Sequence, residues 1–172
     1  MKLYYMPGAC SLAAHITLNE IGADFDLEWV DGVTKKTQSG RDFHELNPNG
    51  YVPALELADG EVLIEAPAIL QYLADTKPET GVAPANGTLE RVRVQQYLNF
   101  VASELHKSFS PFFAAQRPEG QARESAMAKL RKRMDYLESL LADGREYLVG
   151  GTFTVADAYA WVVASWAKPV GI

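Results

Sequence analysis

The feature that most limits how this chain can fold is a change in hydrophobic patterning across residues 76–87. This segment holds two prolines and two glycines and shows no apolar periodicity, which is typical of a linker between domains. Strand and helix patterns alternate before it, whereas helical spacing alone follows it. The sequence therefore predicts two domains, an α/β domain at 1–80 and an all-α domain at 88–172.

The first domain is predicted to follow the order βαβ-ββα. A Pro-Gly turn separates the first strand from the first helix, and an Asn-Pro-Asn-Gly turn precedes a hairpin of two strands. Its elements are expected at residues 2–6, 11–22, 25–29, 52–57, 61–64 and 67–75. Helices of the second domain are expected at residues 88–115, 121–141 and 154–167.

Composition excludes several classes of protein. With 48% hydrophobic and 22% charged residues, the chain has the balance of an ordinary globular protein. Its formal net charge of −6 is spread along the sequence, and no cluster of Lys and Arg indicates nucleic-acid binding. No leader pattern and no apolar run of ~20 residues is present, so we expect a cytoplasmic protein with no membrane partner.

Cys10 is the only cysteine, so it is either a small buried hydrophobic residue or a reactive thiol. It lies at or just before the first turn of the predicted helix, where free N–H groups and about half a positive charge favour an anion. A thiolate is stabilised at such a position, whether it belongs to Cys10 or to a bound thiol ligand. We expect Ser11 either to donate a hydrogen bond to that thiolate or to cap the helix.

Pro53 stands near the start of a predicted strand, where a proline is tolerated only at an edge or an entry point. Either it is a simple edge proline, or the Val52–Pro53 bond is cis and turns the Val52 N–H and C=O outward. An outward amide pair binds an extended peptide by β-augmentation. The second interpretation therefore predicts a peptide-binding position.

Four short motifs, combined with the βαβ-ββα order, make the chain resemble a known family: Cys10-Ser11, Val52-Pro53, Glu65-Ala66 and residues 103–107. The order is similar to the thioredoxin fold of glutathione transferases, and the motifs look like those of the bacterial beta class. The resemblance covers the whole chain. It implies a thioredoxin-like domain followed by an all-helical domain, in a soluble homodimer that activates the thiol of glutathione.

The resemblance also implies a role for individual residues of the first domain. Cys10 would lie beside the glutathione sulfur, with Tyr5 as a weaker alternative that other transferase classes favour. Glu65 would accept the α-amino group of the γ-glutamyl end, while Lys35 would pair with the glycyl carboxylate. The implied glutathione contacts of this domain are Ala9, Cys10, Lys35, Tyr51, Val52, Pro53, Glu65 and Ala66, and the implied catalytic residues are Cys10, Ser11 and His106.

Helical geometry arranges the residues of the second domain. At ~100° per residue, Asn99, Ser103 and His106 share one face of an α-helix, whereas Glu104 and Lys107 point elsewhere. By resemblance, the first three residues face the glutathione site, and His106 acts on the thiol or on the electrophile. Glu104 would reach the site across the dimer, and Lys107 belongs to the same motif.

The leading prediction is transfer of the glutathione thiolate to small, mostly apolar electrophiles, as in detoxification, with glutathione as cosubstrate and no metal. One alternative is a glutathione-dependent redox enzyme, such as a thiol transferase, peroxidase or dehalogenase, that acts through Cys10. The other is a non-catalytic binder of glutathione or apolar ligands. Replacing Cys10 by alanine separates the first two, because only redox exchange must then disappear.

The end of the chain carries two further expectations. Thr154 and Asp157 are spaced as in a capping box, which predicts the start of a helix. The sequence then stops at Ile172, whereas the resemblance implies further C-terminal helices that cover part of the electrophile pocket. We therefore expect glutathione binding to be preserved better than conjugation.

Overall fold

The structure, a computed structural model, describes residues 1–172. The chain separates into two compact units, Met1–Ala85 and Asn86–Ile172, and each contains its own set of buried apolar side chains. The dividing point lies within the segment that is rich in proline and glycine.

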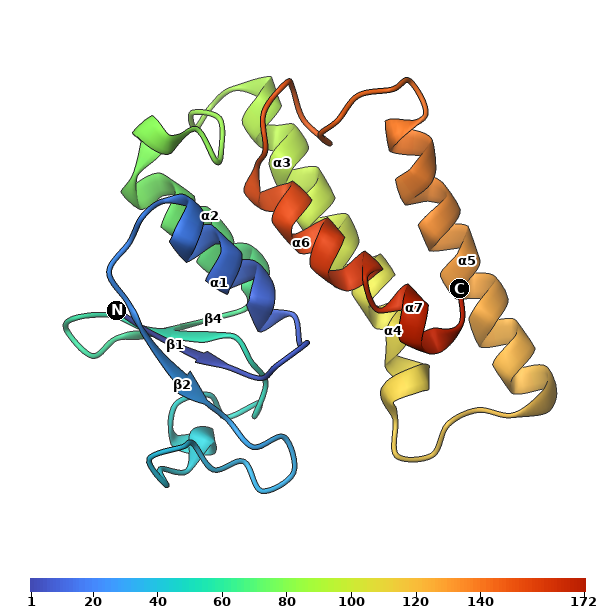
Figure 1. The fold of residues 1–172 in the computed structure, drawn as a ribbon, viewed down its shortest axis with the longest axis horizontal. Helices are drawn as coiled ribbons and strands as arrows, with labels where there is room; N and C mark the ends of the chain where they lie inside the picture. Colours follow the sequence, from blue (N-terminus) through green and yellow to red (C-terminus); the bar gives the residue numbers. More distant parts are fainter. The chain divides into compact units, whose positions relative to one another are not determined.

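The first unit is a mixed four-stranded sheet with two helices. Its strands lie in the order β2-β1-β3-β4, with β1 parallel to β2 and antiparallel to β3. The helices α1 and α2 pack against each other on one face of the sheet (Figure 1). The elements are β1 (Lys2–Tyr5), α1 (Ser11–Glu20), β2 (Asp26–Trp29), β3 (Ala54–Glu56), β4 (Val62–Ile64) and α2 (Ala66–Thr76). The predicted βαβ-ββα order is confirmed.

Both faces of this sheet are covered. Successive residues of a strand point to opposite faces, and the neighbours Leu3 and Tyr4 on β1 are both buried. On the face away from the helices, Tyr4 packs in a cluster with Val30, Phe43 and Val52, and its ring lies 5.8 Å from that of Phe43. The segment between β2 and β3 therefore covers this face, and it brings Val52 into the core.

The second unit is entirely helical. Its elements are α3 (Leu89–Phe100), η3 (Val101–Leu105), α4 (His106–Phe113), α5 (Gly120–Leu141), α6 (Val155–Ala164) and α7 (Ala167–Val170). Two expectations about helix continuity are wrong. The helix predicted at 88–115 is interrupted by η3, which is a π-helical turn, and the helix predicted at 154–167 ends at Ala164.

The π-helical turn could not be read from apolar spacing. The apolar residues of this stretch that are fully buried recur every three or four positions, at Val94, Leu98, Val101, Leu105 and Phe109. That spacing is compatible with an uninterrupted α-helix. One wider turn leaves all five side chains buried, so the pattern does not reveal it.

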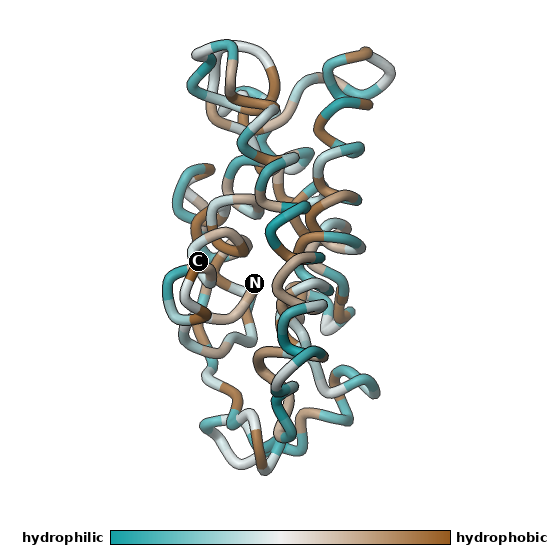
Figure 2. The backbone as a smooth tube through the Cα atoms, turned by 90° about the vertical axis from the view of Figure 1, so that its right-hand side faces the viewer, coloured by the Kyte–Doolittle hydropathy of each residue, from teal (hydrophilic) through white to brown (hydrophobic).

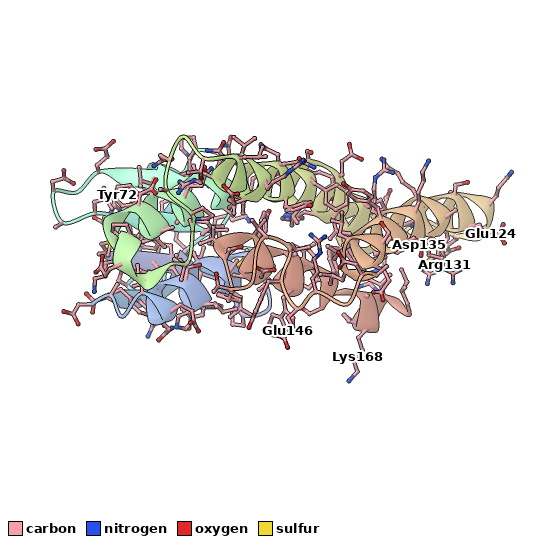
Figure 3. All side chains as sticks on the ribbon, turned by 90° about the horizontal axis from the view of Figure 1, so that it is seen from above. Tyr72, Glu124, Arg131, Asp135, Glu146 and Lys168 are labelled. Atoms are coloured by element: carbon pink, nitrogen blue, oxygen red, sulfur yellow. The ribbon has the colours of Figure 1, made fainter.

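The longest helix, α5, is attached through a narrow part of its surface. It contains 22 residues, of which only Leu130 is buried, and it contacts α4 and η3. Glu124, Arg131 and Asp135 are exposed, and their side chains project outward from the helix in Figure 3. Hydrophilic and hydrophobic residues alternate along the helical tubes in Figure 2. Most of the α5 surface is therefore open to solvent in the single chain.

A capping box starts α6, as predicted. The Asp157 carboxylate accepts hydrogen bonds from the Thr154 N–H and hydroxyl, both at 2.8 Å. These two bonds are to Oδ2. The other carboxylate oxygen of Asp157, Oδ1, accepts from the Leu148 N–H at 2.7 Å, and this bond ties the preceding loop to the helix. None of the helices combines the length and apolar character that crossing a membrane requires.

Candidate functional site

Cys10 occupies the N-cap position of α1. The residue is 9% exposed, and its thiol donates a hydrogen bond to the Val52 carbonyl, 3.2 Å away. The N–H groups of the first helical turn and the helix dipole favour a negative charge at this position. The sulfur therefore lies between an anion-favouring helix start and a backbone group of the segment before β3.

Ser11 is the first residue inside α1, so the N-cap role that we considered for it is wrong. Its hydroxyl is fully buried, accepts a hydrogen bond from the Met6 N–H at 3.2 Å, and donates one to the Met6 carbonyl at 3.3 Å. A hydroxyl has a single proton, and in this state the Met6 carbonyl accepts it. Ser11 thus ties the start of α1 to the end of β1.

The Val52–Pro53 bond is cis, in agreement with the second interpretation of Pro53. The Val52 N–H donates to no atom of its own unit, whereas the Val52 carbonyl accepts the Cys10 thiol. The Val52 N–H is therefore available to pair with a ligand, as expected. The Val52 carbonyl is instead in contact with the Cys10 sulfur. The segment therefore offers a peptide donor next to a thiol.

The turn before Val52 is held by side-chain hydrogen bonds. Asn47 donates its amide to the Tyr51 carbonyl at 2.7 Å and accepts from the Asn49 N–H at 3.1 Å. Gly50 has a φ of 66°, which favours glycine, and a Cβ there would lie 2.7 Å from a ring carbon of His44. Tyr51 is 68% exposed at the end of this turn, so its side chain is accessible to a ligand.

The two lysines of the polar loop differ in their partners. The Lys35 Nζ donates to the Gly50 carbonyl at 3.0 Å, and the Lys35 backbone is left-handed with a φ of 56°. Lys36 instead forms an exposed ion pair with Asp42 at 3.5 Å. Lys35 is therefore the lysine held beside the turn that leads to Val52, and no carboxylate already pairs with it.

Glu65 and Ala66 lie at the N-terminus of α2. Glu65 is exposed and has a φ of 69°, an uncommon conformation for a residue other than glycine. The Ala66 N–H donates to no atom of its own unit, as is usual at a helix start. Ala54 pairs with Ile64, so Pro53 and Glu65 flank the same end of the β3–β4 ladder.

The first unit therefore brings most of its predicted residues to one edge. The Cys10–Val52 and Lys35–Gly50 contacts join three separate parts of the chain, and the β3–β4 register adds Glu65. Tyr5 lies elsewhere on β1, half-buried, with its ring 6.5 Å from that of His15. Its ring therefore packs toward α1, and its backbone carbonyl accepts from the Val30 N–H at 2.9 Å.

The predicted residues of the second unit cluster at the π-helical turn. Asn99 precedes it, Ser103 and Glu104 lie within it, and His106 and Lys107 follow it. The angle of 100° per residue holds for an α-helix and does not apply across a π turn. The prediction that Asn99, Ser103 and His106 share one face therefore assumed the wrong helical geometry. Such turns occur frequently at functional sites.

Glu104 has a partner within its own unit. Its carboxylate forms an ion pair with the Arg133 guanidinium of α5, with N–O distances of 2.6 and 2.7 Å. These two residues, together with Phe100, Lys132 and Tyr136, line a pocket of about 340 Å³. The rings of Phe100 and Tyr136 meet edge to face at 4.8 Å. The pair with Arg133 was not predicted, because the two residues are far apart in sequence.

His106 is held by two aromatic residues from the C-terminal part of the unit. Its Nδ1 lies 3.1 Å from the Tyr159 hydroxyl, and its ring meets the Trp166 indole edge to face at 4.9 Å. Burial, with a smaller contribution from the positive charge of Lys107, lowers the pKa of His106 to about 4. The imidazole is therefore neutral near pH 7. Ser103, by contrast, is exposed and donates to the Asn99 carbonyl at 2.8 Å.

The first unit is a thioredoxin-like domain of the kind that binds thiols. Three features define it: the βαβ-ββα order, a thiol at the start of a helix, and a cis-proline segment before an antiparallel strand. An all-helical unit follows it. Models of the glutathione S-transferase family match both parts. The model of the N-terminal domain matches residues 8–76, and that of the C-terminal domain matches residues 120–171.

Known proteins agree with this assignment. The chain is 44% identical over 170 residues to glutathione S-transferase GstA of Escherichia coli O157:H7, covering 99% of this chain and 84% of that protein. A sphingomonad glutathione S-transferase solved with glutathione matches with a TM-score of 0.95 and 47% identity, covering 100% and 85%. The beta-class enzyme of Sphingomonas chungbukensis matches with a TM-score of 0.95 and 46% identity, over the same shares of the two chains.

The chain belongs to the glutathione S-transferase family. It is a glutathione transferase whose structural neighbours include the bacterial beta class, and the resemblance seen in the sequence is confirmed. Relatives in this family bind glutathione in their solved structures. No group of three or more His, Cys, Asp or Glu side chains is arranged to hold a metal ion.

Proposed function

We propose that the edge of the first unit around Cys10 and Val52 is the glutathione site of this transferase. The observation that carries the proposal is the 3.2 Å contact between the Cys10 thiol and the Val52 carbonyl. It combines a helix start that favours a thiolate with a backbone segment whose N–H is available to a peptide. Glutathione is a tripeptide thiol, so both groups match its chemistry. Ala9, Tyr51 and Pro53 belong to the same proposed contact surface.

The two ends of glutathione would meet different groups. Glu65 offers a carboxylate for the α-amino group, and the Ala66 N–H at the start of α2 suits the γ-glutamyl α-carboxylate. Lys35 suits the glycyl carboxylate, because its Nζ lies beside the turn that leads to Val52 and donates there to a carbonyl rather than to a carboxylate. Ser11 contributes by holding the β1–α1 turn in place rather than by touching the sulfur.

The residues around the π-helical turn would complete the enzyme from the second unit. Asn99, Ser103, His106 and Lys107 are proposed to face the ligand, on the strength of the resemblance and of the π turn itself. A homodimer is supported by α5, whose surface is largely exposed, and by exposed apolar residues on α3 and α5, Leu89, Val92 and Tyr136. Glu104 lies between these helices, which suits its expected position at a subunit interface.

The proposed reaction joins the glutathione sulfur to an electrophilic carbon. With an aryl halide, the sulfur–carbon bond forms, the carbon–halogen bond breaks, and the halide leaves with the bonding electron pair. Small apolar electrophiles are the proposed second substrates, and detoxification in the cytoplasm is the proposed setting, because reduced glutathione is kept available there. Binding energy and orientation of the thiolate would supply the catalysis.

Calorimetric titration with glutathione tests the site, and a pair of neighbouring lysines makes the test sharp. Lys35→Met should weaken binding at least about 10-fold, because a hydrogen bond to a charged group contributes ~1.5–3 kcal/mol, which corresponds to ~10- to 150-fold. Lys36→Met is the matched control, since Lys36 already pairs with Asp42, and it should change the dissociation constant less than about twofold. Equal effects of the two substitutions would remove Lys35 from the site.

A chromogenic assay with chlorodinitrobenzene in the same samples tests the reaction. Turnover by the wild-type chain is expected, and Cys10→Ala separates the mechanisms. If conjugation persists while exchange with glutathione disulfide disappears, Cys10 serves redox exchange and the bound glutathione thiolate is the nucleophile. Absence of glutathione binding in the wild-type chain would reject the site as a whole.

A further inference from the structure

The imidazole of His106 is fixed on two sides by Tyr159 and Trp166, which lie far from it in the sequence. The Tyr159 hydroxyl lies 3.1 Å from Nδ1, and the Trp166 indole packs edge to face against the ring. Only Nε2 is left as the nitrogen through which the ring can meet a ligand. The orientation of the ring, and so the position of Nε2, depends on these two contacts.

Tyr159 is well placed to impose an orientation, because it has little freedom itself. It is 2% exposed and lies in the middle of α6, which packs against α3. The capping box of Thr154 and Asp157 fixes the start of α6 one turn earlier. A hydroxyl on such a buried helix holds its partner more firmly than a group on a loop would.

The hydrogen bond also selects where the imidazole carries its proton. A neutral imidazole has one N–H donor and one acceptor nitrogen, and burial keeps His106 neutral near pH 7. A phenol is the more acidic partner of this pair, so the Tyr159 hydroxyl donates to Nδ1 and the imidazole proton resides on Nε2. Nε2, the ring nitrogen that Tyr159 does not contact, is then a hydrogen-bond donor and not a base.

We propose that Tyr159 is a positioning residue for the transferase reaction: it holds His106 as the Nε2–H tautomer, which presents a neutral donor to the negative charge that moves from sulfur to electrophile. The proposal rests on the proposed function of His106 at the active site. A neutral imidazole in this role stabilises developing charge without adding a positive charge to the site. Tyr159 itself touches neither substrate.

Three variants and a spectroscopic measurement test the proposal. Tyr159→Phe keeps the ring and removes only the hydroxyl, and we expect kcat with chlorodinitrobenzene to fall about 5- to 10-fold while the calorimetric dissociation constant for glutathione stays within about twofold. His106→Gln should retain more activity than His106→Ala, because the Gln amide supplies a donor near Nε2. Tyr147→Phe is the control, a half-buried tyrosine of the same unit with no hydroxyl bond to His106.

Nitrogen NMR of the His106 ring measures which ring nitrogen carries the proton. If Tyr159 had only a structural role, its substitution would leave this tautomer unchanged. The wild-type enzyme should show the Nε2–H tautomer, and Tyr159→Phe should show a mixture of tautomers, with Tyr147→Phe unchanged. An Nδ1–H tautomer in the wild-type enzyme, or unchanged tautomer and kcat in Tyr159→Phe, would overturn the role of Tyr159. Normal activity of His106→Ala is a separate result, which would reject the function proposed for His106 itself.

Discussion

Glu28 on β2 is a buried carboxylate whose protonation should destabilise the first unit. The residue is 8% exposed, forms an ion pair with Lys2 at 3.0 Å, and accepts hydrogen bonds from the hydroxyl and N–H of Ser39 at 2.5 and 3.3 Å. Burial alone would raise the pKa of Glu28, but hydrogen bonds from Ser39, Thr37 and Lys2 outweigh burial and lower the pKa to about 2.

The pKa difference gives the size and the sign of the effect. A fall from 4.5 to about 2 corresponds to about 3 kcal/mol of folding stability, at ~1.4 kcal/mol per pKa unit. Because the folded-state pKa is the lower one, this stability is fully present above about pH 5 and is lost as the pH falls toward 2. By pH 3, about 2 kcal/mol of it should be gone.

Urea unfolding at a series of pH values from 7 to 3 measures this loss. Trp29 is the only tryptophan of the first unit, so its fluorescence reports on that unit when Trp161 and Trp166 are replaced by Phe. In this background, Glu28→Gln should lower the unfolding free energy at pH 7 by about 3 kcal/mol. Its curve against pH should also be flatter than that of the parent, by about 2 kcal/mol between pH 7 and 3.

A second carboxyl group provides the control. The pKa of Asp143 is also lowered to about 2, chiefly by hydrogen bonds from Arg145, but this ion pair is exposed on a loop. Solvent screens such a pair, so Asp143→Asn should leave the unfolding free energy nearly unchanged. Parallel pH curves for Glu28→Gln and its parent would refute the reasoning, since the carboxylate would then contribute nothing specific to the folded state.

Three further predictions concern single side chains. Asp157→Ala removes an acceptor of three hydrogen bonds at the start of α6. It should lower the free energy of unfolding of the second unit, measured in urea, by about 2 kcal/mol. A loss below about 0.5 kcal/mol would contradict the capping role. The ring of His106 should titrate by proton NMR with a midpoint near pH 4. The folded-state pKa of His106 is the lowered one, so its contribution to stability falls as the pH drops from about 6.5 to 4, and His106→Gln should lack this fall. Ser11→Ala leaves both backbone groups of Met6 without their partner and should cost ~1–3 kcal/mol by thermal unfolding, whereas an unchanged midpoint would show that water replaces the hydroxyl.

The order of elements in the first unit was predictable because local signals agree there. Alternating apolar residues mark β2, and Pro67 fits the first turn of α2, so each element is signalled by its own residues. The cis bond at Pro53 was one of two open interpretations, since a proline at a strand entry is compatible with both isomers. The strands are shorter than predicted. The strand expected at 52–57, for example, is the three-residue β3.

Contacts between distant parts of the chain could not be predicted. The Lys35 side chain meets Gly50, and Glu104 meets Arg133, across separations that no local pattern encodes. The π-helical turn was also missed, because it preserves the apolar spacing on which the helix prediction depends. A sequence therefore indicates which residues carry the chemistry more readily than it indicates what holds them in place.

The contact between Cys10 and the Val52 carbonyl turns the only thiol of the chain into a reporter of local opening. A thiol that is 9% exposed reacts slowly with a reagent such as a nitrobenzoate disulfide, so labelling must wait until the segment before β3 moves away from α1. At low reagent concentration, the labelling rate then measures the population of the open form, and at high concentration it approaches the opening rate. Because no second cysteine is present, each labelling event is assigned to one place in the molecule without any engineering of the sequence.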